Sequence, residues 1–195
     1  ALNRISISIP ENSITGIVGP SGSGKSTIID IFLGLLKPDD GTLIIDNNVL
    51  NNENLRSWQD TIGFVSQSIF LSEGTIAENI AFGIPRDQIN FMQVEMAIKQ
   101  AQLTDLINSL EGGVNTKVGE RGVQLSGGQR QRVGIARALY HDTKVLVFDE
   151  ATSSLDGITE KNIMNAIDNL SDRKTIILIA HRLKTVENCD QIFFI

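Results

Sequence analysis

Short apolar runs alternate with stretches of helical periodicity along most of this chain. Five such runs are typical of buried strands, at residues 14–18, 62–65, 145–148, 175–179 and 191–195. Helical spacing of apolar residues follows several of them, at residues 28–36, 126–139 and about 159–170, with a further helix expected before the last run. Strands that alternate with helices predict an α/β fold built on a mostly parallel sheet.

Smaller strands are predicted near the N-terminus. Apolar and polar residues alternate from Leu2 to Ile9, which is typical of a half-buried strand, and a turn follows at residues 11–12. A second turn, at residues 38–41, precedes a strand at residues 42–45. We expect these strands to be antiparallel and to lie at the periphery.

The middle of the chain predicts helices. Thr75 and Glu78 are three residues apart before an apolar pattern, which is the signature of a capping box. Residues 86–110 carry no strand signal, and their apolar residues share one helical side. Glycine and charge are frequent at residues 111–124, so we expect a surface loop there.

This pattern divides the chain into two parts of one domain, residues 1–195. Residues 1–84 and 141–195 form the α/β core with its antiparallel part, and residues 85–140 form an inserted helical subdomain. The first residues already follow a strand pattern and the last stand inside an apolar run. We therefore expect a fragment of a longer protein.

Composition excludes several functions. The 195 residues carry 17 Lys and Arg against 23 Asp and Glu, a net charge of −6, so no basic footprint for nucleic acid is present. No apolar run approaches the roughly 18 residues that a membrane-spanning helix needs, so the isolated chain is expected to be soluble. Cys189 is the single cysteine, which rules out an intramolecular disulfide and favours a reducing compartment.

A glycine-rich loop follows the first buried run. It fits the pattern GxxxxGK[ST] between a strand and a helix, and its residues are Gly19, Pro20, Ser21, Gly22, Ser23, Gly24, Lys25, Ser26 and Thr27. Glycines let successive backbone N–H groups turn inward, which makes a concavity for phosphates at a helix N-terminus. In this pattern Lys25 contacts the β- and γ-phosphates, and the Ser26 hydroxyl is a Mg²⁺ ligand. A glycine-rich turn without function is the alternative.

Polar residues follow three other predicted strands. Gln67 comes after residues 62–65, Asp149 and Glu150 after residues 145–148, and His181 after residues 175–179. Because ligands bind beyond the carboxyl ends of parallel strands, we expect these side chains to converge on one nucleotide. Asp149 then holds Mg²⁺ directly or through water, and Gln67 orients water or Mg²⁺. Glu150 polarises the attacking water, and His181 reaches the γ-phosphate. Taken singly, each has an ordinary alternative as a turn residue, helix cap or structural histidine.

A second anion site is predicted at the start of the long helix. Its residues are Leu125, Ser126, Gly127, Gly128 and Gln129. A serine hydroxyl and backbone amides at a helix N-terminus suit a γ-phosphate, although a simple N-cap would look the same. One chain already has a phosphate loop, so the second site is most simply supplied by a second copy of the molecule in a two-fold pair.

In their order and spacing, these motifs resemble those of the ATP-binding cassette (ABC) ATPases. The phosphate loop, Gln67, LSGGQ, VLVFDE, SSLD and His181 carry the resemblance, which spans essentially the whole chain. It implies a P-loop NTPase (RecA-like) core, ATP and Mg²⁺ as ligands, and a nucleotide-sandwich dimer of identical or homologous halves. Glu150 matches the family's catalytic base, and residues 125–129 with Asp156 come from the partner subunit.

The segments GTIAENI, GERG and AHRL further resemble the exporter branch of that family. This branch implies an attached transmembrane domain, a place at the cytoplasmic face of the plasma membrane, and coupling through Glu120 and Arg121. It also implies an adenine-stacking aromatic residue upstream of residue 1. The alternatives are a non-transport ABC ATPase of DNA repair or translation, an importer ATPase subunit, and a regulatory cassette without turnover. The acidic charge and the exporter-like segments disfavour the first, and the presence of Gln67, Glu150 and His181 disfavours the last.

Overall fold

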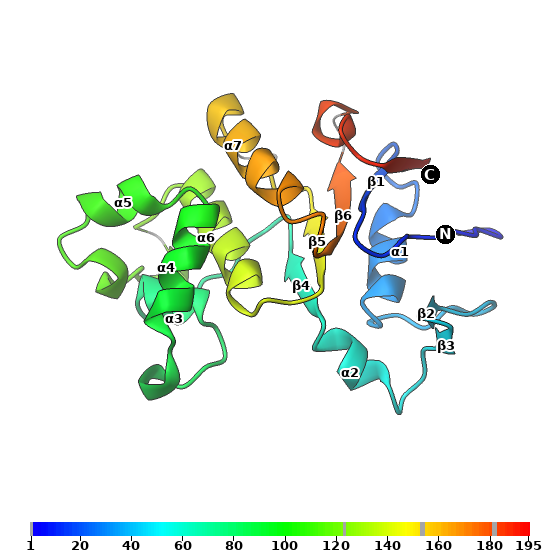
Figure 1. Ribbon diagram of the computed structural model, residues 1–195, viewed down its shortest axis with the longest axis horizontal. Helices are drawn as coiled ribbons and strands as arrows, with labels where there is room; N and C mark the ends of the chain where they lie inside the picture. Colours follow the sequence, from blue (N-terminus) through cyan, green and yellow to red (C-terminus); the bar gives the residue numbers. More distant parts are fainter. Residues whose placement is uncertain (1, 123, 153–154, 181–182) are drawn as a thin grey trace.

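The computed structural model describes residues 2–122, 124–152, 155–180 and 183–195. Figure 1 shows a sheet flanked by helices and, beside it, a lobe made only of helices. The α-helices and strands, in chain order, are β1 (Ile14–Val18), α1 (Lys25–Phe32), β2 (Ile44–Ile45), β3 (Asn48–Val49), α2 (Leu55–Gln59), β4 (Ile62–Val65), α3 (Ile76–Ile80), α4 (Phe91–Gln100), α5 (Thr104–Ser109), α6 (Gly127–Tyr140), β5 (Val145–Asp149), α7 (Gly157–Asp168), β6 (Thr175–Ala180) and β7 (Gln191–Phe194). Short 3₁₀ turns lie at Arg86–Gln88 (η1), Gly113–Asn115 (η2), Glu120–Gly122 (η3) and Leu183–Val186 (η4).

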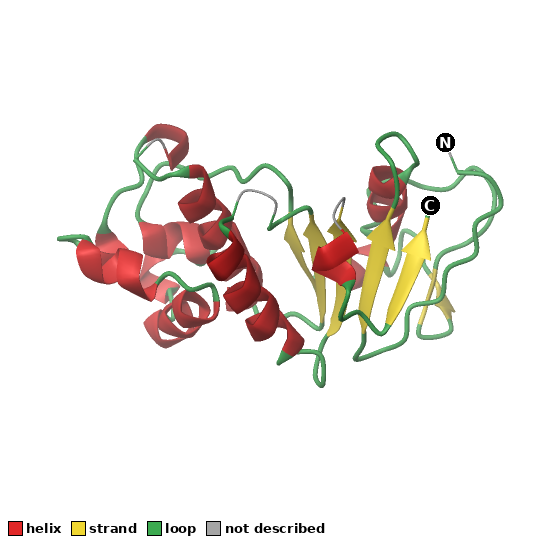
Figure 2. Cartoon of the chain, turned by 90° about the horizontal axis from the view of Figure 1, so that it is seen from above, coloured by secondary structure: helices red, strands yellow, loops and turns green. Residues whose placement is uncertain are grey.

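The main sheet has the strand order β4-β5-β6-β1-β7, and all its pairings are parallel. Because successive side chains of a strand point to opposite faces, each strand contributes to two cores. On β5, Val145 and Val147 pack in the cluster that includes Ile29 of α1, whereas Leu146 and Phe148 pack in the cluster of the helical lobe and α7. Figure 2 shows helices on both sides of this sheet. The predicted parallel α/β fold is confirmed.

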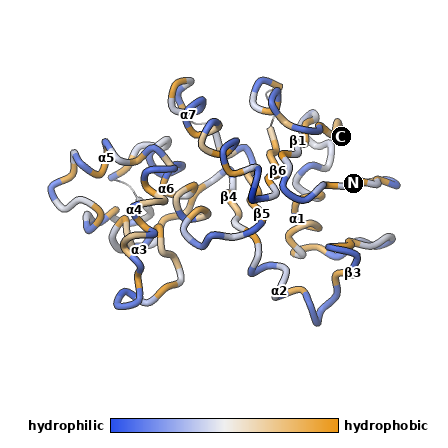
Figure 3. Tube along the Cα trace, viewed as in Figure 1, coloured by the Kyte–Doolittle hydropathy of each residue, from blue (hydrophilic) through white to orange (hydrophobic). Residues whose placement is uncertain are grey.

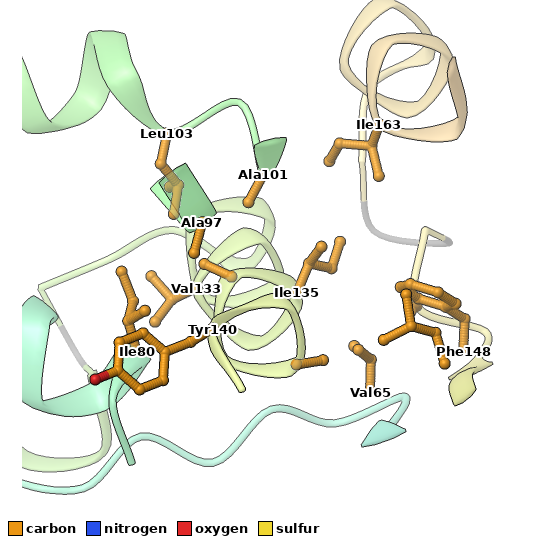
Figure 4. Close-up of a cluster of buried hydrophobic side chains, with 14 of the residues drawn as sticks. Val65, Ile80, Ala97, Ala101, Leu103, Val133, Ile135, Tyr140, Phe148 and Ile163 are labelled. Atoms are coloured by element: carbon orange, nitrogen blue, oxygen red, sulfur yellow. The ribbon is translucent and has the colours of Figure 1, made fainter. Parts of the chain in front are cut away.

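Helix α6 joins the helical lobe to the sheet. Figure 4 shows its side chains Val133 and Ile135 between Ala97 of α4 and Val65 of β4, and all four are at most 1% exposed. The predicted capping box is confirmed, because Glu78 N donates to Thr75 Oγ1 at 3.2 Å and Thr75 N donates to the Glu78 carboxylate at 2.7 Å. Figure 3 shows hydrophobic colour along β6 and hydrophilic colour along the loop before α2.

Two expectations of secondary structure are wrong. Residues 2–9 form no strand, because within the described chain no neighbouring strand offers them a hydrogen-bond ladder, and Ile5 is 42% exposed. The helix expected before β7 is only the short turn η4. The helical prediction for residues 86–110 is confirmed by η1, α4 and α5, and Gln102, with a left-handed φ of 56°, separates α4 from α5.

Candidate phosphate-binding site at the sheet edge

The glycine-rich loop connects β1 directly to α1. Lys25 is the first residue of α1, only 6% exposed, and its Nζ donates to the backbone oxygens of Gly19 and Pro20, at 2.8 Å each. Gly24 has a φ of 105°, a conformation that L side chains rarely adopt. The loop therefore folds around the Lys25 ammonium and holds its charge at the N-terminus of α1.

Close neighbours of this loop exclude larger residues at Gly19 and Gly24. A Cβ on Gly19 would lie 2.4 Å from the backbone oxygen of Ile195, and one on Gly24 would lie 2.5 Å from Leu2 Cδ2. Among the described residues, the hydroxyl of Ser23 is buried without a hydrogen-bond partner. A buried donor without a partner costs free energy, so an anion in the loop would satisfy it.

Gln67 and Glu150 meet at the carboxyl edge of the sheet. Gln67 Nε2 donates to Glu150 Oε2 at 2.8 Å, although the two residues are 83 positions apart. The sheet register brings them together, because Val65 pairs with Phe148 and each strand ends within two residues of that pair. Glu150 has a left-handed φ of 50°, and its N–H donates to Ile179 O at 3.0 Å.

Asp149 lies on the same edge as the glycine-rich loop. It pairs in register with Ile179 of β6, and Ile179 pairs with Ile17 of β1. Two strand spacings therefore separate Asp149 from Ile17, about 10 Å. Since Gly19 follows Ile17 by two residues, the glycine-rich loop and Asp149 both lie at the carboxyl edge of the sheet.

The described residues fit a magnesium ion held largely by phosphate and water. Within these ranges, no three His, Cys, Asp or Glu side chains form a metal-binding group. Magnesium prefers one or two protein oxygen ligands together with substrate phosphates. The Ser26 hydroxyl, the Asp149 carboxylate and the amide oxygen of Gln67 are such ligands, and the Gln67 amide nitrogen is the atom that faces Glu150.

The second predicted anion site forms the N-terminus of α6. Ser126 Oγ accepts from Gln129 N at 3.2 Å, and Gln129 Oε1 accepts from Ser126 N at 2.8 Å, which completes a capping box. The amide of Gln129 is therefore already bonded, in contrast to the expected set of open amides. Gly127 and Gly128 open the helix, where N–H groups have no intrahelical acceptor. Leu125 is buried at 7% exposure and fixes the start of this turn.

These two anion sites lie on different sides of the same chain. Helix α6 packs on β4, at one edge of the sheet, whereas the glycine-rich loop follows β1, the fourth strand of that order. Both helices are labelled in Figure 1, with α6 in the helical lobe and α1 beyond the sheet. One copy therefore does not bring the N-terminus of α6 onto its own loop.

The remaining predicted residues have simpler surroundings. Asp156 is the N-cap of α7 and accepts from Thr159 N at 3.0 Å, and this backbone hydrogen bond lowers the pKa of Asp156. Glu120 is exposed in η3, and Arg121 lies in the same turn. His181 lies outside the described residues.

Arg137 is a residue whose contacts the sequence did not reveal. Its guanidinium donates to Asn79 O at 2.9 Å and to Phe70 O at 3.0 Å, and it lies 4.7 Å from the ring centroid of Phe82. Burial lowers the pKa of Arg137. It ties α6 to α3 and to the loop after Gln67. The one sequence feature that could have indicated these contacts is an arginine on an otherwise apolar helix face.

A broad hollow of the described chain lies away from these residues. Its volume is about 1740 Å³, and it lies between the N-terminal segment and the β2–β3 hairpin, behind α1. Gln67, Asp149 and Glu150 do not line it. Size alone would therefore misplace the site, and the convergent polar groups at the sheet edge locate it better.

A parallel sheet with a lysine-bearing phosphate loop after one strand and acids after another defines a P-loop nucleotide-binding domain. The chain belongs to the ABC transporter family, whose model matches residues 2–153, and it carries the ATP-binding ATPase domain of that family.

Individual relatives are exporters and flippases. The chain is 42% identical over 193 residues to an ATP-dependent lipid A-core flippase of Cupriavidus pinatubonensis, covering 98% of this chain and 33% of that protein. It is 46% identical over 189 residues to ABC transporter B family member 22 of Arabidopsis thaliana, covering 97% of this chain and 15% of that protein.

A solved structure of a bacterial Atm1-family ABC exporter with ATP bound matches the fold with a TM-score of 0.90. The identity is 40%, and the match covers 96% of this chain and 32% of that one. The chain thus spans about a third of the length of the flippases that it matches. In the part that the structure describes, no helix is long and apolar enough to cross a membrane.

Proposed function

We propose that this chain hydrolyses ATP with Mg²⁺ as one half of a nucleotide-sandwich dimer and thereby powers export or lipid flipping through a transmembrane domain. The hydrogen bond between Gln67 and Glu150, at the edge that carries the phosphate loop, is the observation that supports it most. It joins a carboxylate and an amide side chain, the two kinds of group that the proposed activation of a water molecule needs.

The reaction follows from these groups. Lys25 and the loop amides hold the β- and γ-phosphates, and Glu150 accepts a proton from the attacking water while Gln67 orients it. The bond between the γ-phosphorus and the bridging oxygen breaks, and ADP leaves with the electron pair. Mg²⁺, held through Ser26, Asp149 and Gln67, would neutralise phosphate charge. His181 is proposed to contact the γ-phosphate.

The dimer is proposed because the N-terminus of α6 is remote from the loop of its own chain. A second copy related by a two-fold axis would bring its Ser126, Gly127 and Gly128 onto the γ-phosphate. Asp156 would come from the same partner subunit. Each nucleotide would then be closed by two chains, and hydrolysis would release them.

Coupling to a transmembrane domain is proposed at the surface around Arg137. Phe70 is 62% exposed and Phe82 is 48% exposed, and both contact the Arg137 guanidinium. Turn η3, which contains Glu120 and Arg121, packs near Leu71, because a Cβ on its last residue, Gly122, would meet Leu71 Cδ1 at 2.7 Å. Exposed aromatic rings with charges beside them suit a protein partner. The relatives named as flippases and exporters support a place at the cytoplasmic face of the plasma membrane.

Glu150→Gln tests this function. Removal of the base should lower ATP turnover at least about 100-fold while nucleotide binding is retained, since general-base catalysis contributes about 10²–10⁴-fold. Glu95→Gln, an exposed change on α4, is the matched control and should turn over ATP at the wild-type rate. Turnover near wild type in Glu150→Gln would refute the assignment.

A further inference from the structure

One carboxylate outside the predicted site joins three segments of the chain. Glu160, in the first turns of α7, accepts a hydrogen bond on Oε1 from Thr152 Oγ1 at 2.9 Å and another from Thr185 Oγ1 at 3.3 Å. Thr152 belongs to the segment after β5, and Thr185 belongs to η4, after β6. The two hydroxyl groups therefore meet on a single oxygen atom.

Thr152 stands two residues after Glu150. It is only 6% exposed, and its backbone oxygen accepts from Leu155 N at 3.1 Å, in the turn that leads to α7. A bond to its hydroxyl thus restrains Thr152 itself, close to the proposed base Glu150.

Thr185 stands four residues after His181. Its neighbour Val186 is fully buried against β1, where a Cβ on Gly16 would lie 2.9 Å from Val186 Cβ. Segment η4 is consequently held from two sides, by Val186 on the sheet and by Glu160 on α7.

N-capping of α7 does not explain the position of the Glu160 side chain. Asp156 already caps that helix by accepting from Thr159 N, and Glu160 uses its own N–H in the first helical bond, to Asp156 O at 2.8 Å. The Glu160 side chain instead points to hydroxyl groups from outside the helix. Its charge is compatible with the positive end of α7, and bonds from hydroxyls to a carboxylate are among the stronger ones.

We propose that Glu160 is a positioning residue that fixes the segments after Glu150 and His181 relative to each other for ATP hydrolysis. This inference rests on the proposed function. Both segments would act on one γ-phosphate, and a misplacement of about 1 Å can cost about 100-fold in rate. Ground-state nucleotide binding depends on the loop after β1, which Glu160 does not contact among the described residues.

Glu160→Ala should therefore lower kcat about tenfold and leave KM for ATP within about twofold. Glu160→Gln keeps an acceptor oxygen for both hydroxyl groups and should retain more than about half of kcat. The matched control is Glu95→Ala, an exposed glutamate on α4. Thr185→Val removes one hydroxyl donor at similar side-chain volume and should lower kcat about threefold. This variant tests the same inference if Glu160→Ala does not fold.

A double-mutant cycle separates positioning from general stability. Thr152→Val should cause no further loss of kcat when it is added to Glu160→Ala, because its partner is already gone. Three results would overturn the inference. The first is an equal loss of kcat in Glu160→Ala and Glu160→Gln, and the second is a rise of KM in parallel with the fall of kcat. The third is an effect of Thr152→Val on kcat that is the same with and without Glu160→Ala. Wild-type turnover that survives Glu150→Gln would instead overturn the proposed function.

Discussion

Gly134 of α6 offers a sharp test of how packing positions the catalytic edge. A Cβ at this glycine would lie 2.4 Å from Ile69 Cδ1 and 2.7 Å from Ile69 Cγ1. Ile69 follows Gln67 by two residues, in the loop between β4 and α3. In Gly134→Ala, the Ile69 side chain must therefore shift, and we expect part of the strain to fall on the loop that holds Gln67 against Glu150.

The magnitude combines two opposing terms. Alanine is about 1 kcal/mol better than glycine in a helix interior, and an additional methyl group in a packed core costs about 1–3 kcal/mol. The net free energy of unfolding should fall by about 0–2 kcal/mol. The turnover of ATP should fall more clearly, because about 1 Å of displacement at Gln67 disturbs a 2.8 Å hydrogen bond to the proposed base.

Denaturant unfolding and steady-state ATPase kinetics measure these two effects. Gly157→Ala at the start of α7 is the control for stability, because no heavy atom lies within 4 Å of the added Cβ. It should be as stable as wild type or more stable. If Gly134→Ala gains as much stability as Gly157→Ala and keeps the wild-type kcat, Ile69 does not position Gln67 and the reasoning is refuted.

Two further predictions concern the loop lysine and a helix cap. Lys25→Ala should weaken ATP binding about 10- to 100-fold, since it removes a buried charged donor. Titration calorimetry with ATP measures this affinity, with Lys161→Ala as the exposed control. Equal ATP affinities of Lys25→Ala and Lys161→Ala would contradict the prediction. The hydrogen bond from the backbone N–H of Thr75 lowers the pKa of Glu78 below its ordinary value of 4.5. The charged carboxylate therefore stabilises the fold above about pH 4.5, and this stabilisation is lost as the pH falls through the lowered pKa. Glu78→Gln should thus be less stable than wild type at pH 7, and the urea midpoints of the two proteins should converge as the pH falls through the lowered pKa of Glu78. A difference that stays constant with pH would contradict the role of Glu78 in the cap.

Local signals predicted the parts of the fold that depend on neighbouring residues. The Thr75 capping box needs only four consecutive residues, and the buried runs of β1, β4 and β5 carry their own apolar pattern. Residues 2–9 carry a strand pattern as well, but a strand requires a partner, and the described chain supplies none.

The residues of the candidate site could be predicted where they directly follow the ends of parallel strands. Gln67 and Glu150 meet because parallel strands end at the same edge, a rule that sequence order already implies. The contacts of Glu160 and Arg137 could not be predicted, because they join residues 25 and 58 positions apart through packing that no periodicity encodes.

Sedimentation velocity of Glu150→Gln, with and without ATP and Mg²⁺, tests the central claim most directly. The account predicts that the 21.3 kDa chain is a monomer without nucleotide and doubles its mass with ATP and Mg²⁺, because the N-terminus of α6 then closes on the γ-phosphate of the partner subunit. A monomer at ATP concentrations that saturate binding would contradict the shared site.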